Sequence, residues 1–380
     1  MKSLKSKYRL RVLGVILYLM IAGFLTNSAF ASSPVTLVDF HGRSVTLKTP
    51  VERIVLLESS QAHELAAILG DDFAAKIVGW DESFKKYGGD GYARFIEKFP
   101  QLENIPVVGF MFDGTMSVER VIALKPDVVI AHEYMFSLGG DTTKTALAQL
   151  EQAGVPVLFI DYYMDPLQNS TKSTLLLGKI LGKEERAQAL VDFYNQQMNL
   201  IFARLENIQT PKPKVYLECA YEGPAEYGIS YGNVAWGRII KKCGGENIAE
   251  PILGDKRQPL SPEYVIEQNP DIIILTGRNY ATPGSVKMGY LTSPEDVRNS
   301  IKAYVGRPGW DILHAVKNGK VYSIYHGYVF SIYNFAAVQA FAKWFYPEAF
   351  QDIDPNAALK EYHEKFMPID YTGTFVFSYF

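Results

Sequence analysis

The chain has 380 residues, 48% of them hydrophobic and 21% charged, and a formal net charge of -3 at pH 7. This is the composition of an ordinary globular protein, long enough for two domains with sizeable cores, and it argues against intrinsic disorder. Because Lys and Arg form no cluster beyond the N-terminus, the sequence offers no basic surface for nucleic acid.

The first 31 residues have the features of a secretory signal peptide. Five Lys and Arg residues lie between positions 2 and 11, an apolar stretch covers residues 12–25, and an A-x-A site ends at Ala31. The apolar stretch is short for a membrane span, so we predict cleavage after Ala31 rather than an uncleaved anchor. No Cys stands at this site, so the lipid anchor of a bacterial lipoprotein is not indicated.

The segment after the signal peptide alternates strands with helices. The pattern over residues 35–47 predicts a hairpin that turns at His41, Gly42 and Arg43. Beyond this hairpin, the apolar patterns predict buried strands over residues 53–57, 77–80 and 155–160, and helices over residues 61–69 and 144–153. Such alternation predicts a parallel sheet.

One segment of the chain occurs twice. Residues 117–130 read S-V-E-R-V-I-A-L-K-P-D-V-V-I, and residues 261–274 read S-P-E-Y-V-I-E-Q-N-P-D-I-I-I. In each copy the Ser is suited to cap a short helix, and the Glu lies in its first turn, where it interacts with the helix dipole. The Pro-Asp pair ends the helix before a buried strand. The agreement between the copies predicts two related lobes.

A long helix is predicted between the lobes. Residues 183–207 contain no Gly or Pro and repeat apolar residues at helical spacing, and Pro211 and Pro213 follow. We therefore predict an N-terminal lobe over residues 32–182, a connecting helix over residues 183–209 and a C-terminal lobe over residues 210–380. Because a helix resists hinge bending, we expect modest rocking of the lobes rather than a large closure.

The second lobe is also predicted to be α/β. Its elements are strands over residues 215–219 and 321–325, helices over residues 236–242, 335–344 and 357–366, and a strand or aromatic tail over residues 371–380. The fold class is therefore α/β, with two Rossmann-like lobes, parallel-rich sheets, one long connecting helix and a ligand cleft between the lobes.

Ligands of parallel sheets gather beyond the carboxyl ends of the strands, and here these positions are rich in aromatic residues. Any one of them is as well explained by packing, but together they predict a cleft for a flat or apolar chelate, with Arg238 or Arg278 facing its negative charge. The candidate ligand-binding residues are Glu58, Trp80, Phe84, Phe110, Phe112, His132, Tyr134, Tyr163, Tyr221, Tyr231, Trp236, Arg238, Arg278, Tyr280, His326 and Tyr328.

Two histidines are candidate metal ligands. His132 and His326 fall at comparable places in the two predicted lobes, and with Glu58 and a phenolate they would suit a ferric or similar ion. Without tight spacing, hydrogen bonding or packing explains them as well. Cys219 and Cys243 are the two cysteines of the chain, and either a disulfide or two separate buried thiols fits the sequence, whose spacing matches no common metal site.

Catalysis has little support in the sequence. Residues 228–232 spell G-x-S-x-G, but no predicted strand directly precedes them, as a nucleophile elbow requires. The chain contains no H-E-x-x-H, no G-x-x-x-x-G-K-[ST] and no G-x-G-x-x-G after a strand. We therefore predict a binding protein without a cofactor, and an exported enzyme that acts in the same cleft is the alternative of another class.

Several motifs resemble those of the helix-linked periplasmic binding proteins of ABC importers, which carry iron-siderophore, haem, cobalamin and, in some members, oxyanions such as molybdate. These motifs are P-V-E-R-I-V-L-L at residues 50–57, the two repeat copies, C-G-G-E-N-I-A at residues 243–249 and R-P-G-W-D-I-L-H-A-V-K-N-G-K-V-Y at residues 307–322. The resemblance covers essentially the whole mature chain. It implies a periplasmic monomer in which Glu119 and Glu263 dock onto arginines of a permease dimer; the alternative for both is interaction with the helix dipole alone.

The resemblance also bears on the ligand. The chain is longer than the cobalamin-binding members, with a C-terminal extension from about Pro347, and is more similar to the subgroup for metals and metal chelates. Aromatic walls suit a ferric siderophore-like chelate, whereas an oxyanion requires a compact ring of NH and OH donors. An iron chelate is thus the expected ligand, and molybdate or tungstate, another metal and cobalamin are the alternatives.

Overall fold

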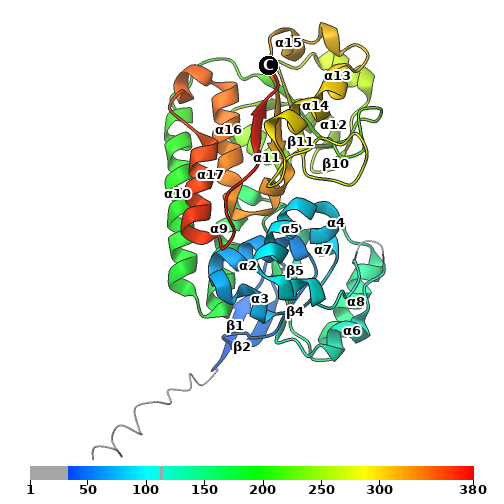
Figure 1. Ribbon diagram of the computed structural model, residues 1–380, viewed down its shortest axis with the longest axis vertical. Helices are drawn as coiled ribbons and strands as arrows, with labels where there is room; N and C mark the ends of the chain where they lie inside the picture. Colours follow the sequence, from blue (N-terminus) through cyan, green and yellow to red (C-terminus); the bar gives the residue numbers. More distant parts are fainter. Residues whose placement is uncertain (1–32, 112–113) are drawn as a thin grey trace, which may run out of the picture.

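The computed structural model describes residues 33–111 and 114–380 and contains two α/β lobes beside a column of helices (Figure 1). The predicted signal peptide over residues 1–31 and the candidate Phe112 lie outside the described residues. Among the described helices, none has the length and apolar character needed to span a lipid bilayer.

The N-terminal lobe contains the predicted hairpin and a parallel sheet. Strands β1 (Ser33–Val38) and β2 (Ser44–Thr49) pair antiparallel. The parallel sheet has the order β4 (Ile77–Trp80), β3 (Ile54–Leu56), β5 (Val128–His132) and β6 (Val157–Ile160). Strands β3, β5 and β6 are buried throughout, which explains their unbroken apolar sequences. The helices of this lobe are η1 (Ser59–Gln61), α2 (Ala62–Leu69), η2 (Gly70–Asp72), α3 (Phe73–Lys76), α4 (Ser83–Tyr87), α5 (Gly89–Lys98), η3 (Pro100–Asn104), α6 (Val118–Ala123), α7 (Glu133–Leu138) and α8 (Asp141–Gln152).

The C-terminal lobe has a mixed sheet around a parallel centre. Strands β7 (Lys214–Cys219), β11 (Ile272–Gly277) and β12 (Val321–Tyr325) are parallel. Antiparallel strands extend the sheet, β8 (Ile229–Tyr231) and β10 (Arg257–Pro259) at one edge and β13 (Val376–Ser378) at the other, and β9 (Glu246–Asn247) pairs with β7. The helices of this lobe outside the column are α11 (Trp236–Lys242), α12 (Glu250–Leu253), α13 (Pro262–Gln268), α14 (Pro294–Val305), η4 (Trp310–Ile312), α15 (His314–Lys317), η5 (His326–Phe330), η6 (Ile332–Asn334) and η7 (Pro347–Phe350).

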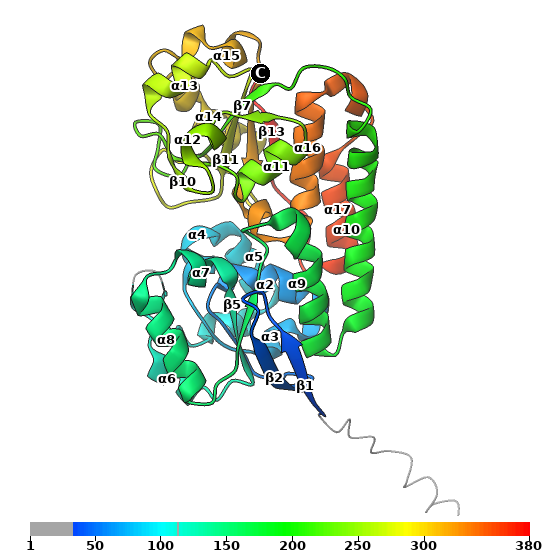
Figure 2. The ribbon, with the colours of Figure 1, turned by 180° about the vertical axis from the view of Figure 1, so that it is seen from behind.

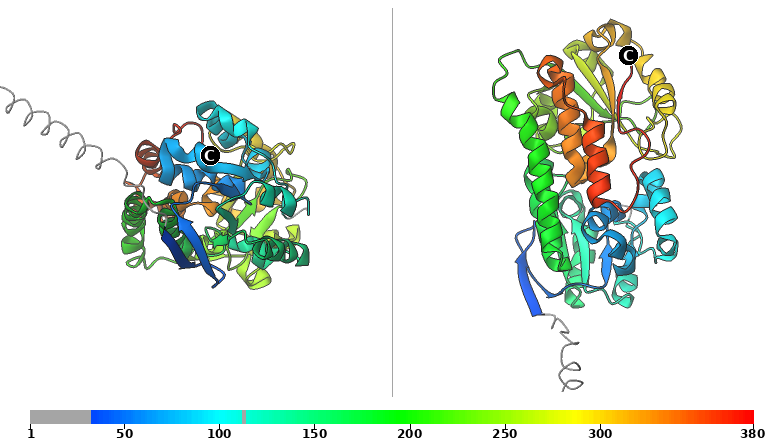
Figure 3. Two further views of the ribbon diagram at one scale, coloured as in Figure 1. Left: turned by 90° about the horizontal axis from the view of Figure 1, so that it is seen from below. Right: turned by 60° about the vertical axis from the view of Figure 1, so that its left-hand side comes forward.

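The connection between the lobes is a column of helices. Helix α10 (Glu184–Leu205) is the predicted connecting helix, and α16 (Phe335–Phe345) and α17 (Pro355–Phe366) lie beside it (Figure 3). Phe193 of α10 packs against Phe335 of α16 and Phe366 of α17. Helix α9 (Pro166–Leu181), which the sequence patterns do not predict, runs alongside α10 (Figure 2). The C-terminal extension thus supplies one helix of the column and the edge strand β13.

Polar contacts join the two lobes to each other and to the column of helices. Asn334 Nδ2 donates to Ser170 Oγ of α9 at 3.1 Å, and Arg186 of α10 donates to backbone carbonyls of α2 and α17. Glu64 of α2 is buried and accepts a 3.4 Å hydrogen bond from the backbone N–H of Ile332 in the other lobe. Burial raises the pKa of Glu64 to about 7.

The two repeat copies fold as predicted. Ser117 Oγ accepts a hydrogen bond from the N–H of Arg120 at the start of α6, and Ser261 caps α13 in the same way. The Asp of each copy has a further role, because Asp127 accepts from the N–H groups of Glu52 and Arg53, and Asp271 accepts from that of Lys214. Each repeat therefore holds the beginning of the neighbouring strand, β3 or β7.

Candidate functional site

A hollow of about 380 Å³ lies between the lobes, at the carboxyl ends of the parallel strands. This interlobe cleft is lined from the N-terminal lobe by Glu58, Tyr87, Phe110, Tyr134 and Tyr163, and from the C-terminal lobe by Cys219, Tyr221, Ile229, Tyr231, Arg257, Arg278, Tyr280, His326 and Phe330. Residues from both sheets meet there because Glu58, Tyr134 and Tyr163 follow β3, β5 and β6, and Arg278 and His326 follow β11 and β12.

The fold brings many of the predicted ligand-binding residues together in this cleft. They are Glu58, Phe110, Tyr134, Tyr163, Tyr221, Tyr231, Arg278, Tyr280 and His326. Their positions at strand ends, rather than their residue types alone, explain this result.

Other predicted residues do not line the cleft. Trp80 packs in the core near Tyr92, and Phe84 faces a smaller hollow beside the cleft. Tyr328 is buried among other tyrosines. Arg238, one of the two arginines predicted to face a ligand, instead pairs with Asp165 at 2.7 Å. An aromatic ring that follows a strand turns into the core when helices cover that side, because burial of its apolar surface is favourable.

Five residues of the cleft are absent from the predicted set: Tyr87, Cys219, Ile229, Arg257 and Phe330. Arg257 is the most informative of them, because it lies opposite Tyr231 in the antiparallel pairing of β10 with β8. Arg257 could be predicted from the sequence only if these two short edge strands were recognised there. Phe330 ends the same 3-10 helix that begins at His326.

The acidic side of the cleft is built around Glu58. Its carboxylate accepts hydrogen bonds from the hydroxyl groups of Tyr134, Ser60 and Ser83. Asp81 lies behind it and accepts from the N–H of Ser59 at 2.7 Å. Burial, with the charge of Glu58, raises the pKa of Asp81 to about 8, so Asp81 is largely protonated at neutral pH. The hydroxyl groups hold Glu58 in place.

The basic side of the cleft contains two arginines without carboxylate partners. Arg278 is 6% exposed, and its guanidinium lies over the rings of Tyr325 and Phe330, at 5.7 and 5.2 Å from their centroids. Arg257 lies over the ring of Tyr163 at 5.5 Å. Within the described residues, neither guanidinium forms an ion pair, and Nε of Arg278 is buried without a hydrogen-bond partner. A buried cation without an anion is costly, so this side is prepared for a negatively charged group.

His326 lines the cleft, and its Nε2 lies 3.8 Å from Sγ of Cys219, which lines the cleft as well. Its Nδ1 accepts a hydrogen bond from the indole N–H of Trp236 at 3.3 Å and lies 2.8 Å from the hydroxyl oxygen of Thr276. Because an indole nitrogen can only donate, the ring hydrogen of the neutral imidazole lies on Nε2. Burial, with the charges of Arg278 and Arg257, lowers the pKa of His326 well below its usual value, so the ring stays neutral. Trp236 therefore supports the cleft from beneath without lining it.

The base of the cleft is aromatic. Tyr163 of the N-terminal lobe stacks on Phe330 of the C-terminal lobe, with ring centroids 4.7 Å apart and planes 16° apart. Tyr134 lies at 5.0 Å from Tyr163 and 6.1 Å from Phe330. Burial raises the pKa of Tyr163 to about 12, and its hydroxyl group lies within reach of Tyr231 and Arg257, which moderate the rise. This hydroxyl is thus a further donor for a ligand.

The two predicted metal-ligating histidines are separated by the fold. His326 lines the cleft, whereas His132 is fully buried beside the ring of Tyr134 and is absent from the lining. Across the part of the chain that the structure describes, no group of three or more His, Cys, Asp or Glu side chains is arranged to hold a metal ion. Cys219 and Cys243 are both buried free thiols, so the structure has the second of the two arrangements considered for them.

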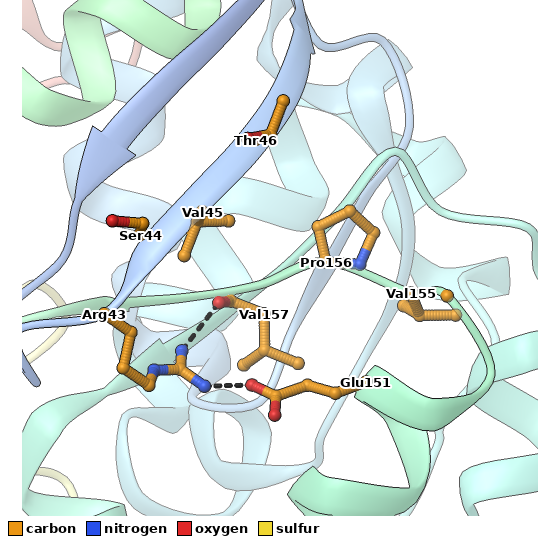
Figure 4. Close-up of a pocket in the computed structure, with 9 residues that line it drawn as sticks. Arg43, Ser44, Val45, Thr46, Glu151, Val155, Pro156 and Val157 are labelled. Carbon is orange, nitrogen blue, oxygen red and sulfur yellow. Dashed lines mark hydrogen bonds and ion pairs between the residues drawn. The ribbon is translucent and has the colours of Figure 1, made fainter.

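A second hollow, of about 370 Å³, lies between β2, α8 and β6 (Figure 4). It also contains an arginine, but Arg43 donates to Glu151, to the carbonyl oxygen of Val157 at 2.8 Å and to Asp39 at 2.7 Å. Since the charge of Arg43 is matched within the protein, this hollow lacks the unmatched charge of the interlobe cleft.

Comparison with known proteins agrees with this architecture. The sequence model of the family described as periplasmic binding protein matches residues 54–326. The crystal structure of the TroA-like periplasmic binding protein FepB from Veillonella parvula is 37% identical, covers 91% of this chain and 99% of FepB, and superposes with a TM-score of 0.83.

Two curated relatives are similar over much of their length. The molybdate-binding protein MolA of Haemophilus influenzae is 25% identical over 93% of this chain and 97% of MolA. The uncharacterized ABC transporter substrate-binding lipoprotein YvrC of Bacillus subtilis is 28% identical over 77% of this chain and 78% of YvrC. These comparisons exclude the alternative of an exported enzyme, and the chain belongs to the periplasmic binding protein family, the substrate-binding proteins of ABC transporters.

Proposed function

We propose that this protein captures an anionic iron chelate of the ferric siderophore type in the interlobe cleft and delivers it to the permease of an ABC importer. The observation that carries this proposal is Arg278, which is buried in the cleft without a carboxylate partner among the described residues. A ligand with negative charge supplies the missing partner, and bidentate hydrogen bonds from a guanidinium suit paired oxygen atoms.

The walls of the cleft favour a chelate with flat, apolar surfaces. Tyr163 and Phe330 form the base of the cleft. Phe110 and Tyr87 line it from the N-terminal lobe, with their ring centroids 6.1 Å apart. A volume of about 380 Å³ is in the range of small-molecule sites and exceeds the need of a single oxyanion. Because the ring of His326 carries its hydrogen on Nε2, we propose that it donates to the chelate and that the metal keeps its own ligands.

Docking to the permease is proposed to involve one Glu on each lobe. Glu119 and Glu263 lie in the first turns of α6 and α13, and both are exposed. The two repeat copies therefore offer similar acidic contacts at separate places on the molecule. We propose that a permease dimer binds one receptor monomer through both and rocks the lobes apart.

We also propose that the protein acts in the periplasm after removal of residues 1–31. The composition of this segment supports export, and the similar FepB from Veillonella parvula is described as a periplasmic binding protein. Mass spectrometry of protein isolated from the native periplasm tests the cleavage after Ala31.

Molybdate is the second candidate ligand. The similarity to MolA over 93% of this chain favours it, and so do the donors in the cleft, namely Arg257, Arg278, the Nε2–H of His326 and the hydroxyl of Tyr163. An oxyanion would use these donors without the aromatic walls.

Titration of the purified mature chain separates these candidates. Ferric tris-catecholate, a trianionic chelate, is added while the intrinsic Tyr and Trp fluorescence is followed, with molybdate, cyanocobalamin and haemin in parallel. We expect saturable quenching by the chelate, and native mass spectrometry should find one chelate for each chain. Binding of molybdate, cobalamin or haem without binding of the chelate would contradict the proposed ligand.

A further inference from the structure

The R-P-G-W motif of the sequence places Arg307 in the core of the C-terminal lobe, beneath one wall of the cleft. Its guanidinium forms two parallel bonds with the carboxylate of Glu218, at 2.6 and 2.9 Å, and both side chains are almost completely buried. The rings of Tyr227, Tyr304 and Trp310 surround it at 4.3, 4.6 and 5.1 Å. Such a paired and enclosed guanidinium is rigid.

Arg307 and Glu218 hold the backbone that forms the cleft wall. Arg307 donates from Nε to the carbonyl oxygen of Pro224 at 2.8 Å and from Nη2 to that of Glu226 at 2.5 Å. Glu218 accepts from the N–H of Gly228 at 2.8 Å. Residues 220–228, here named the wall loop, begin next to Cys219 and carry Tyr221 into the cleft before Ile229 begins β8. The position of this wall therefore depends on Arg307.

The same cluster contacts the helix that carries Glu263. Trp310 donates from its indole nitrogen to the hydroxyl of Tyr227 at 2.7 Å. Gly309 adopts φ 80° and lies so close to α13 that a Cβ there would approach Cδ1 of Ile266 to 2.8 Å. Burial raises the pKa of Tyr227, and the nearby Glu263 carboxylate adds to the rise. Helix α13 thus rests directly on the turn that contains Arg307.

We propose that Arg307 is a positioning residue that couples α13 to the wall loop, so that a partner bound at α13 alters the cleft. This inference rests on the proposed docking role of Glu263. A displacement of α13 changes the contact of Ile266 with Gly309, two residues after Arg307, and Arg307 passes the change to the carbonyl groups of Pro224 and Glu226. The chain of contacts is continuous, and coupling between its ends is a measurable quantity.

A double-mutant cycle without ligand or permease tests the coupling, with amide hydrogen exchange of the wall loop as the readout. Ile266→Ala loosens α13 on the turn, and Arg307→Lys keeps the charge but loses the fork that reaches the wall loop. We expect Arg307→Lys to speed exchange about tenfold, as loss of one hydrogen bond to a charged group implies, and Ile266→Ala to speed it by no more than this. The double variant should exchange no faster than Arg307→Lys alone. The matched control Ile312→Ala, at an exposed side chain of η4, should leave these rates unchanged.

The proposal would be overturned if the increases in exchange rate caused by the two single substitutions multiplied in the double variant. It would also be overturned if Ile266→Ala left the exchange rates of the wall loop unchanged. If Arg307→Lys fails to fold, Glu218→Gln, which keeps an acceptor oxygen but removes the carboxylate that fixes the guanidinium of Arg307, replaces it in the cycle with the same expected result. Because the cycle contains no ligand, a chain that fails to bind ferric tris-catecholate contradicts the proposed function and leaves this test intact.

Discussion

The indole nitrogen of Trp236 lies 3.3 Å from Nδ1 of His326 and donates its hydrogen to that atom. We predict that Trp236→Phe mixes the two neutral tautomers of His326, because Thr276 then remains the one hydroxyl group near Nδ1 and can either donate or accept. Nitrogen NMR of the imidazole should show the change. The lost hydrogen bond and the cavity left by the smaller ring should together lower the free energy of unfolding by about 2–4 kcal/mol. Trp344→Phe, at a ring stacked on Tyr322, is the control and should leave the imidazole shifts as they are.

Replacement of Arg278 should affect binding and stability in opposite directions. Arg278→Met is expected to weaken binding of ferric tris-catecholate about tenfold to a hundredfold, as the loss of one or two hydrogen bonds to a charged group implies. The free energy of unfolding should stay equal or rise, because the substitution removes a buried charge that no carboxylate balances.

The same substitution at Arg43 provides the matched control. Arg43→Met leaves the buried carboxylate of Asp39 without its cation and should lower the free energy of unfolding by about 3 kcal/mol, with unchanged chelate affinity. Urea unfolding and fluorescence titration measure both quantities. A large decrease in the free energy of unfolding in Arg278→Met would contradict the conclusion that the charge of Arg278 has no carboxylate partner in the cleft.

Glu64 should make the protein less stable as the pH rises. Its folded-state pKa is raised from 4.5 to about 7, so between these values the folded protein binds a proton that the unfolded chain has lost. The free energy of unfolding then falls with increasing pH, by at most about 1.4 kcal/mol per unit for this one group. Glu64→Gln should flatten the dependence over this window and stabilise the protein above pH 7.

Urea unfolding between pH 4.5 and 8 measures this effect. Asp81, with a pKa raised to about 8, should leave a residual slope of the same sign in Glu64→Gln. The exposed Glu185→Gln serves as the control and should retain the slope of the unchanged protein. An identical slope in Glu64→Gln would show that this carboxyl ionises normally.

Removal of both proposed docking carboxylates should separate binding from transport. Glu119→Ala with Glu263→Ala is expected to abolish uptake through the reconstituted permease and to leave the chelate affinity unchanged, since both residues lie outside the cleft lining. Glu267→Ala, an exposed carboxylate on the same helix as Glu263, should retain uptake. Loss of chelate affinity in the double variant would contradict the docking role.

Much of the fold could be predicted because periodicity and chain punctuation are local. Strand β7 and helix α11 lie where the patterns place them, and both repeat copies have the expected Ser caps. Helix α9 was missed, although Asp165 caps its beginning and Gly182 ends it at φ 63°. Its mixed polar and apolar face, packed between α10 and the N-terminal lobe, obscures the helical period.

The cleft was predictable only where strands determine it. Parallel strands share an edge, so residues that directly follow predicted strands, such as Glu58, Tyr134 and Tyr163, come together at the cleft. Which aromatic ring after β4 faces the cleft depends on how α4 and α5 pack, and there Tyr87 lines the cleft whereas Trp80 does not. Arg257 could not be predicted in this way, because its position depends on the pairing of β10 with β8. Strands of three residues are too short to show a periodic pattern in the sequence.

The helical column also bears on how the molecule unfolds. Phe193 touches both α16 and α17, and Arg186 joins α10 to α2 and to the end of α17. Loss of either lobe would therefore expose apolar surface of the column that the other lobe also uses. The two lobes should melt together in a single cooperative transition, in which the calorimetric and van't Hoff enthalpies agree.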